Sequence, residues 1–423
     1  MSGANVFTDS RKATYLNIAA ADHPLRSPIS EQTHAAARRY RLARVREQLE
    51  LHDCAAILLH DPLNVRYALD VSNMQMWMAH NPTNYAVICA GGPAVHFAYA
   101  GSEHLAAGLD TVDEARTAIA WQYMDTPGRV ADTARAWAAE VAELVAEHGG
   151  GNRRLAVDVC DPAGIVALET LGLEIVEGRE LTEHARVIKS ADELELMRWT
   201  VAVCDAAIQR MYERSAEPGR SELEIWAELH HENIRNGGEW IETRLLSSGP
   251  RTNPWFQEAS ARVPAAGEML AFDTDMIGPY GYCADVSRSW TVGHTAPSPP
   301  QRDLYLHARE QIDHNTSLLR AGLELREFDA RSWRIPDRFL ANEYGWAFHG
   351  VGMADEYPGA PTHPSFVGSA YDQAGLCLEA GMVLAVESLV GEQGRGECVK
   401  LETQVVITED GCERLDAFPW EDW

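Results

Sequence analysis

The feature that most constrains this chain is a set of acidic residues inside apolar stretches of its C-terminal half. Segments 271–290, 381–391 and 398–411 each contain an apolar run typical of a buried strand. A carboxylate inside such a strand loses its hydration and needs a partner. The fold must therefore bring these acids to a shared compensating group. The acids are Asp273 and Asp285 in the first segment, Glu387 in the second and Glu402 in the third.

Residues 271–290, AFDTDMIGPYGYCADVSRSW, are typical of a hairpin with three acids. Asp273 and Asp275 are two apart in an apolar strand, which predicts that they share one face. Asp285 follows a Gly-Pro-Tyr-Gly turn, on the second strand of the expected hairpin. Neighbouring acids repel one another, and a divalent cation would remove that repulsion. The alternative interpretation is that these are turn and surface acids of an acidic protein.

The segment FHGVGMADEYPG, residues 348–359, places His349 beside glycines that let the backbone approach a site closely. Alone, a histidine beside glycines is more often structural than a metal ligand. Together with the acids, it completes an oxygen-rich site with one imidazole. This ligand set predicts two divalent ions about 3.5 Å apart, bridged by carboxylates. Fe, Mn, Co and Zn all accept such ligands.

The first half of the chain alternates between strand and helix patterns, which predicts an α/β domain. We expect an irregular arm over residues 1–30 and a domain over residues 1–185. The apolar face of one expected helix contains Trp137, and GGG at 149–151 ends that helix. We expect the first helix at 33–51 and strands at 55–61, 85–92 and 154–161.

A second domain is expected over residues 186–423. Ser190 and Glu193 form a capping-box pattern at the start of a long helix. Further helices are expected at about 221–236 and 300–320. The fold class is therefore α/β (α+β), with two domains.

Charge and composition exclude several partners. The 423 residues contain 36 Lys and Arg against 63 Asp and Glu, a net charge of −27. Nucleic acids and anionic membranes both need a basic face, so we expect neither as a partner. Apolar runs long enough to span a membrane and a signal-peptide pattern are both missing. The eight cysteines form no C-x-x-C pair, which favours reduced thiols in a cytoplasmic enzyme.

The order Asp, Asp, His, Glu, Glu resembles the pita-bread family of methionine aminopeptidases, prolidases, aminopeptidases P and creatinases. DVSRSW (285–290), HGVG (349–352), VES (386–388) and LET (401–403) are similar to its metal-ligand motifs. Residues 39–70 resemble the creatinase-type N-terminal domain, which here would precede a pita-bread catalytic domain. The resemblance implies the metal ligands Asp273, Asp285, His349, Glu387 and Glu402, with Asp275 as a sixth.

Two departures from the peptidase pattern concern the reaction. Glu356 stands where peptidases continue the HGVG loop to a second His. Trp255, in NPWFQE, stands where they have an upstream His. Both imidazoles of peptide hydrolysis are therefore missing. A decayed peptidase and a different reaction on the same metals are both consistent with this pattern.

The Met- and Trp-rich segment SNMQMWMAHNPTNY (72–85) favours the different reaction. Aromatic and thioether side chains suit a sulfonium cation, although core packing would also explain them. The combination resembles the metal-dependent dimethylsulfoniopropionate lyases, a branch of the same family. The resemblance implies β-elimination from a small sulfonium substrate, favours iron, and suggests a homodimer.

The residues expected to carry this reaction lie on both halves of the chain. We predict Asp355 as the base and Tyr344 as a residue that orients substrate or stabilises charge. Trp77 is the candidate for the sulfonium cage, in its own chain or across a dimer, and Trp255 is a weaker candidate. The alternatives are an Xaa-Pro dipeptidase or aminopeptidase P, a creatinase-like amidinohydrolase, and a non-enzymatic binding protein.

Overall fold

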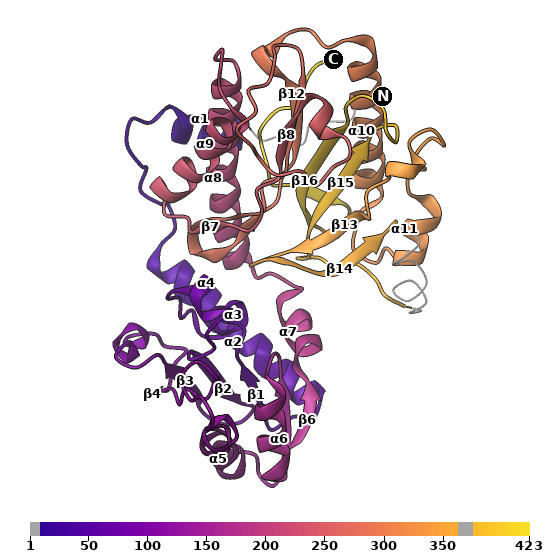
Figure 1. The fold of residues 1–423 in the computed structure, drawn as a ribbon. Coiled ribbons are helices and arrows are strands. Elements are labelled where there is room, and N and C mark those ends of the chain that lie inside the picture. The colour runs from indigo at the N-terminus through magenta and orange to yellow at the C-terminus, as the bar shows by residue number, and fades with distance from the viewer. Residues whose placement is uncertain (1–8, 363–374) are drawn as a thin grey trace. The chain divides into compact units, whose positions relative to one another are not determined.

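The computed structural model describes residues 9–362 and 375–423 (Figure 1). The chain divides into two compact units. The smaller unit is Ser30–Arg186, and the larger unit combines Met1–Ile29 with Val187–Trp423. Each unit has its own buried apolar core.

The smaller unit is built on one six-stranded mixed sheet with the strand order β4-β3-β2-β1-β5-β6. β1 runs parallel to β5 and antiparallel to β2, so the sheet changes direction at its centre. The strands are β1 (Ala56–Leu59), β2 (Tyr85–Cys89), β3 (Ala94–Ala98), β4 (Glu114–Thr117), β5 (Arg154–Val157) and β6 (Glu174–Glu177).

Helices pack on this sheet through the apolar positions that the sequence predicted. The buried side chains of α5 include Trp137 and Val141, which face the sheet core. The helix ends at Gly149, where a Cβ atom would lie 2.5 Å from the carbonyl oxygen of Val145. The helices are α2 (Glu31–Leu51), α3 (Pro62–Leu69), α4 (Gln75–Met78), α5 (Val130–His148), α6 (Pro162–Thr170) and α7 (Gly178–Arg186).

The larger unit contains two three-stranded sheets and one five-stranded sheet, ordered β11-β10-β7, β12-β9-β8 and β14-β13-β15-β16-β17. The long strands β15 and β16 pair along eight residues and are interior strands of the five-stranded sheet. The strands are β7 (Trp240–Ile241), β8 (Leu246–Ser248), β9 (Met269–Phe272), β10 (Met276–Ile277), β11 (Cys283–Ala284), β12 (Arg288–Thr291), β13 (Trp346–Val351), β14 (Asp355–Pro361), β15 (Val383–Val390), β16 (Val399–Ile407) and β17 (Cys412–Arg414).

Capping explains where the long helices of this unit begin. Ser190 accepts a hydrogen bond from the backbone of Glu193, and the Glu193 carboxylate accepts one in return, so the predicted capping box is confirmed. The helices are α1 (Asp9–Ala20), α8 (Ala191–Ser215), α9 (Glu222–Arg235), α10 (Pro299–Leu318) and α11 (Leu325–Arg331). Among residues 9–362 and 375–423, no helix is both long and apolar enough to cross a membrane.

The expectation of an irregular arm over residues 1–30 is wrong for residues 9–20, whereas residues 21–30 contain no helix or strand, as expected. Residues 9–20 form α1, and this segment groups with the larger unit rather than with residues 30–186. Tyr15 and Ile18 are each only 1% exposed, and the Tyr15 ring packs against Phe418. The apolar residues occur three and four apart for a single turn, too short a repeat to distinguish from a polar arm.

If α1 is a packed part of the larger unit, truncating its buried side chain will destabilise that unit. We expect Ile18→Ala to lower the free energy of unfolding by about 2–5 kcal/mol, because it leaves a cavity. Leu16→Ala is the matched control, since Leu16 is 40% exposed on the same helix. It should change the free energy by less than about 0.5 kcal/mol. Equal effects of the two substitutions in urea denaturation would contradict the packed helix.

Candidate metal centre

Strand pairing brings two of the predicted acids directly together. Glu387 on β15 lies opposite Glu402 on β16 in the antiparallel register. β13 pairs with the other edge of β15 and places His349 opposite Ala385. Two like charges opposite one another on a sheet are destabilising unless a cation lies between them. Both glutamates are almost completely buried.

The second sheet supplies the aspartates. Asp273 directly follows β9, and Asp285 lies between β11 and β12. The Ser287 hydroxyl lies 2.8 Å from an oxygen of Asp273 and 2.8 Å from an oxygen of Glu402, and it connects the two sheets. Ligand atoms of Asp273, Asp285 and Glu402 all lie within 4.8 Å of one another. The structure therefore gathers all four acids from segments that are far apart in the sequence.

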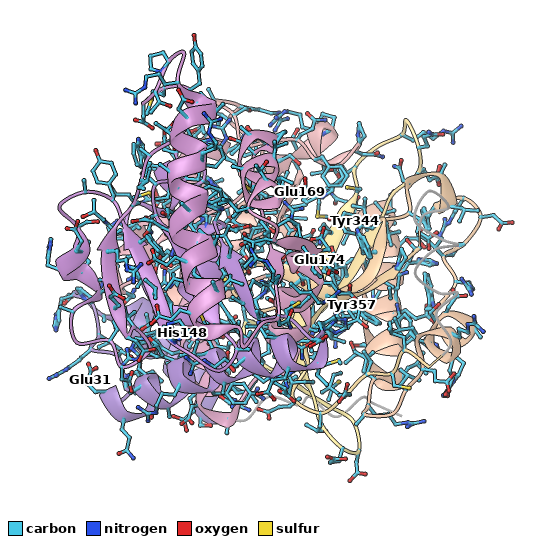
Figure 2. The ribbon with its side chains drawn as sticks, turned by 90° about the horizontal axis from the view of Figure 1, so that it is seen from below. Glu31, His148, Glu169, Glu174, Tyr344 and Tyr357 are labelled. Atoms are coloured by element: carbon cyan, nitrogen blue, oxygen red, sulfur yellow. The ribbon has the colours of Figure 1, made fainter. Side chains whose placement is uncertain are left out.

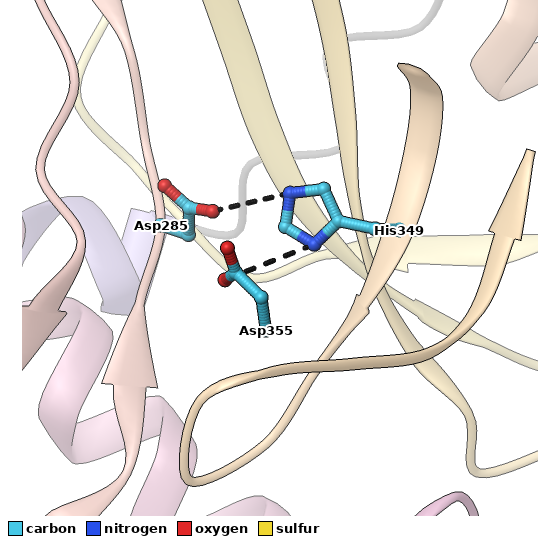
Figure 3. Close-up of side chains that lie close together, drawn as sticks. All are labelled: Asp285, His349 and Asp355. Carbon is cyan, nitrogen blue, oxygen red and sulfur yellow. Dashed lines mark ion pairs between the residues drawn. The ribbon is translucent and has the colours of Figure 1, made fainter. Parts of the chain in front are cut away.

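His349 completes the cluster. Its Nε2 atom lies 3.4 Å from Asp285, 3.3 Å from Glu387 and 3.8 Å from Glu402. Its Nδ1 atom is 3.0 Å from the carbonyl oxygen of Gly350, to which it can only donate. Figure 3 shows one ring nitrogen of His349 facing Asp285 and the other facing Asp355. This backbone contact directs the Nε2 lone pair toward the carboxylates, as in histidines that bind metals.

The cluster contains oxygen atoms that no protein group satisfies. Asp285 Oδ1, Glu387 Oε1 and Glu402 Oε1 are buried and have no hydrogen-bond donor within the described residues. Buried acceptors are normally satisfied, so these three oxygens need a cation or water. Carboxylate oxygens with one imidazole fit Mn, Fe, Co or Zn, and the residues present therefore fit a pair of divalent ions.

Sequence analysis missed Lys400, the one lysine in this cluster. Its ammonium lies 3.1 Å from Asp273, 2.9 Å from Glu387 and 3.3 Å from Glu402, and the side chain is completely buried. It binds Oε2 of both glutamates and leaves each Oε1 atom without a hydrogen bond among the described residues, facing His349 Nε2. The signal was present, because a lysine two residues before Glu402 in an apolar strand must share its face.

The electrostatics show how strongly the cluster needs positive charge. Burial and the neighbouring carboxylates raise the pKa of Asp285 and of Glu402 well above the usual range. Burial opposes the charged form of His349, but Glu387 and Asp355 outweigh it and raise the His349 pKa to about 10. Perturbations of this size are typical of functional sites.

Asp275 does not follow the predicted pattern. The strand β9 ends at Phe272, so the argument that Asp273 and Asp275 share a strand face is wrong. Asp275 adopts a left-handed backbone with φ of 36°, and its carboxylate accepts a hydrogen bond from Thr243 at 2.5 Å. Burial and the charge of Asp273 raise its pKa to about 8. The groups of potential ligands among the described residues do not include it, and its ligand role stays a prediction.

A cavity of about 600 Å³ opens beside His349 and Glu387. Asp355 lines it, begins β14 and lies opposite Val351, so it stands at the turn of a hairpin rather than in a loop. The Asp355 side chain is 53% exposed, but desolvation by the cavity walls and the charge of Glu387 raise its pKa, and its Oδ1 atom lies 3.8 Å from His349 Nδ1. The other lining residues include Tyr344 and Tyr357, which are labelled in Figure 2.

The remaining predicted residues lie in different surroundings. The Lys400 ammonium lies 4.7 Å from the centre of the Tyr344 ring. Trp255 is buried in an apolar cluster that Tyr344 borders, and it does not line the cavity. Trp77 belongs to the smaller unit, is 40% exposed and packs edge-on against Tyr99. Its role in a substrate cage stays a prediction.

Comparison with known proteins identifies the family. Residues 195–409 match metallopeptidase family M24. The chain belongs to this family. It is 45% identical over 388 residues to dimethylsulfoniopropionate lyase DddP of Roseovarius nubinhibens, across 91% of this chain and 86% of the relative. The same enzyme of Roseobacter denitrificans is 42% identical over 391 residues, across 92% and 87% of the two chains.

Solved structures of M24 peptidases share the fold. An Xaa-Pro dipeptidase from Bacillus anthracis aligns with a TM-score of 0.70 and 22% identity, across 90% of this chain and 98% of that chain. The expected fold class, α/β with a pita-bread domain, is confirmed. The likeness at this identity concerns the fold alone.

Lys400 provides a test of the charge balance. We expect Lys400→Met to lower the free energy of unfolding of the metal-free protein by about 3–5 kcal/mol, because three carboxylates lose their internal cation. Added Mn²⁺ should restore most of that loss. The control is Lys12→Met, at an exposed lysine of α1. Denaturation with EDTA and with Mn²⁺ measures both effects, and an unchanged stability of metal-free Lys400→Met would contradict the assignment.

Proposed function

We propose that this protein cleaves dimethylsulfoniopropionate to dimethyl sulfide and acrylate by β-elimination. The observation that carries the proposal is its similarity to two dimethylsulfoniopropionate lyases over nine-tenths of the chain. The site agrees with this activity, because the acids and His349 are gathered while both peptidase histidines are absent. The enzyme is thus a carbon–sulfur lyase of the M24 family.

The reaction needs stabilisation of charge on the substrate carboxylate. Two divalent ions, held by Asp273, Asp285, His349, Glu387 and Glu402, would supply Lewis acidity there. Iron is our preferred metal because of the lyase resemblance, and Mn, Co and Zn fit the same ligands. The substrate itself provides a good leaving group, since dimethyl sulfide departs as a neutral molecule.

Asp355 is the residue that we assign as the base. Its carboxylate lines the cavity and faces the same space as His349. It would take a proton from the carbon next to the substrate carboxylate. The C–H electron pair forms the double bond of acrylate, while the C–S bond breaks and its electrons leave with sulfur. A pKa raised above the usual aspartate value strengthens Asp355 as a base.

Tyr344 and Glu356 shape the cavity around that base. The Lys400 ammonium lies over the Tyr344 ring, and this contact supports a role for Tyr344 in orienting the substrate. Glu356, at the position of the peptidase histidine, is buried in an ion pair with Lys189. In this ion pair Lys189 holds the Glu356 carboxylate in place. We take this as support for a lyase rather than an Xaa-Pro peptidase.

The smaller unit supports a homodimer in which Trp77 contacts the sulfonium group. Trp77 and Tyr99 form an exposed aromatic pair, with Met74 and Met76 exposed on the same segment as Trp77. Exposed apolar groups of this kind mark interaction surfaces, and twofold dimers are the commonest oligomers. The eight free cysteines support a reducing compartment, which we take to be the cytoplasm.

The activity is tested by mixing purified, metal-loaded protein with dimethylsulfoniopropionate. We expect dimethyl sulfide in the headspace and acrylate in solution in equal amounts, both abolished by chelation. Xaa-Pro dipeptides serve as the competing substrates. Peptide hydrolysis without formation of acrylate would replace the lyase proposal with the peptidase alternative.

Asp355→Asn separates proton transfer from binding. It removes the basic oxygen at nearly constant size, so turnover should fall by at least about a hundredfold. Metal content and KM should change little, because Asp355 is not among the five proposed ligands.

Trp77→Ala is the contrasting variant. Losing a cation–π contact of about 0.5–2 kcal/mol should raise KM and leave turnover nearly unchanged. Steady-state kinetics with metal analysis of both variants checks the assignment. Near-normal turnover of Asp355→Asn would move the base to another residue.

A further inference from the structure

The smaller unit contains a cavity of its own at the carboxyl ends of β1 and β5. Its volume is about 450 Å³, within the range of small-molecule sites. His60 and Asp61 directly follow β1, and Cys160 and Asp161 follow β5. From β1 the chain leads to β2 on one side of this pair, and from β5 it leads through α6 to β6 on the other. Open α/β sheets bind ligands at such switch points.

Two deeply buried side chains that line this cavity each have one polar atom without a hydrogen bond among the described residues. His60 is 4% exposed, and its Nδ1 atom lies 3.0 Å from the carbonyl oxygen of Val159, to which it donates. Its Nε2 atom is therefore an acceptor, and no donor among the described residues reaches it. Trp121 is 2% exposed, and its Nε1–H group has no acceptor there. Buried groups of this kind are normally bonded.

The charged side chains that line the cavity favour a positively charged ligand. Asp61 and Asp161 are its two carboxylates, and neither lysine nor arginine lines the cavity. Two thioethers, Met78 and Met124, add soft apolar surface next to the Trp121 indole. Carboxylates, sulfur and an aromatic ring together suit a small organic cation and repel an anion.

A bound metal ion explains this cavity less well. The metal-ligating groups found among the described residues all lie in the larger unit. Burial also raises the pKa of Cys160 to about 12, so its thiol stays protonated and is a poor ligand. Burial lowers the pKa of His60 to about 4, which keeps its ring neutral at pH 7.

We propose that this cavity binds a small amino alcohol in its protonated form. The ammonium group would donate to His60 Nε2 and face the carboxylates, while the hydroxyl oxygen would accept from Trp121 Nε1. The site is independent of the proposed lyase reaction, because none of its residues belongs to the metal centre or its cavity.

Calorimetric titration of the metal-loaded protein with ethanolamine at pH 7 tests the proposal. We expect saturable binding of one molecule per chain, with a Kd of about 1–10 mM for so small a ligand. Tetramethylammonium has the same charge but no N–H group, and it should bind at least about tenfold more weakly. Acetate should not bind. Absence of ethanolamine binding, or equal binding of tetramethylammonium, would overturn the proposal.

Three variants locate the binding. His60→Phe keeps an aromatic ring and removes the acceptor, and should weaken ethanolamine binding at least about tenfold. Asp161→Asn, at the exposed mouth, should weaken it about threefold or more without disturbing the buried aromatic residues. Asp132→Asn makes the same charge change at an exposed position of α5 outside the cavity, and should bind as the wild type does. Unchanged binding by Asp161→Asn together with His60→Phe would overturn the assignment.

Discussion

The stability of the larger unit depends on positive charge that offsets the repulsion among four buried carboxylates. Glu387 and Glu402 face each other across a strand pair, and Asp273 and Asp285 approach from a second sheet. An isolated buried carboxylate is very unfavourable, and four in contact are far more so. Lys400 supplies one fixed positive charge, on one side of the cluster. The oxygens without partners on Asp285, Glu387 and Glu402 are where divalent ions complete the balance.

The sequence predicted the elements well where pattern and capping agree. The helix from Ser190 and the strands at 56–59 and 154–157 follow from a capping box and from short apolar runs. It failed at α1, whose apolar repeat is one turn long, and at Asp275, because the end of β9 depends on the backbone turn. Neither feature has a periodic signal in the residues alone.

The candidate site was predicted because acidic residues occur inside apolar strands, and not from any knowledge of where the fold places them. Acids inside apolar strands require a common partner wherever the fold places them, which is why all four come together. Lys400 was missed because only the acids and His349 were considered as charged groups of the site. The role of Trp77 could not be derived, since it depends on how chains assemble.

The departures from the peptidase pattern show how one fold supports different reactions. Glu356 replaces an imidazole and is held by Lys189, while Asp355 beside it remains open to the cavity. The proposed ligands are retained, and the groups around them have changed. This chain therefore differs from the peptidase pattern in the residues around the proposed metal site rather than in the proposed ligands.

The central claim is that the buried acids and His349 form a two-metal centre. Elemental analysis of protein stripped with chelator, reloaded with Fe²⁺ or Mn²⁺ and dialysed measures this most directly. The account predicts two ions per chain in the wild type, and clearly fewer in Glu402→Gln, whose side chain belongs to two of the three groups of possible ligands among the described residues. Wild-type protein that retains no metal, or a Glu402→Gln variant that still retains two ions, would contradict it.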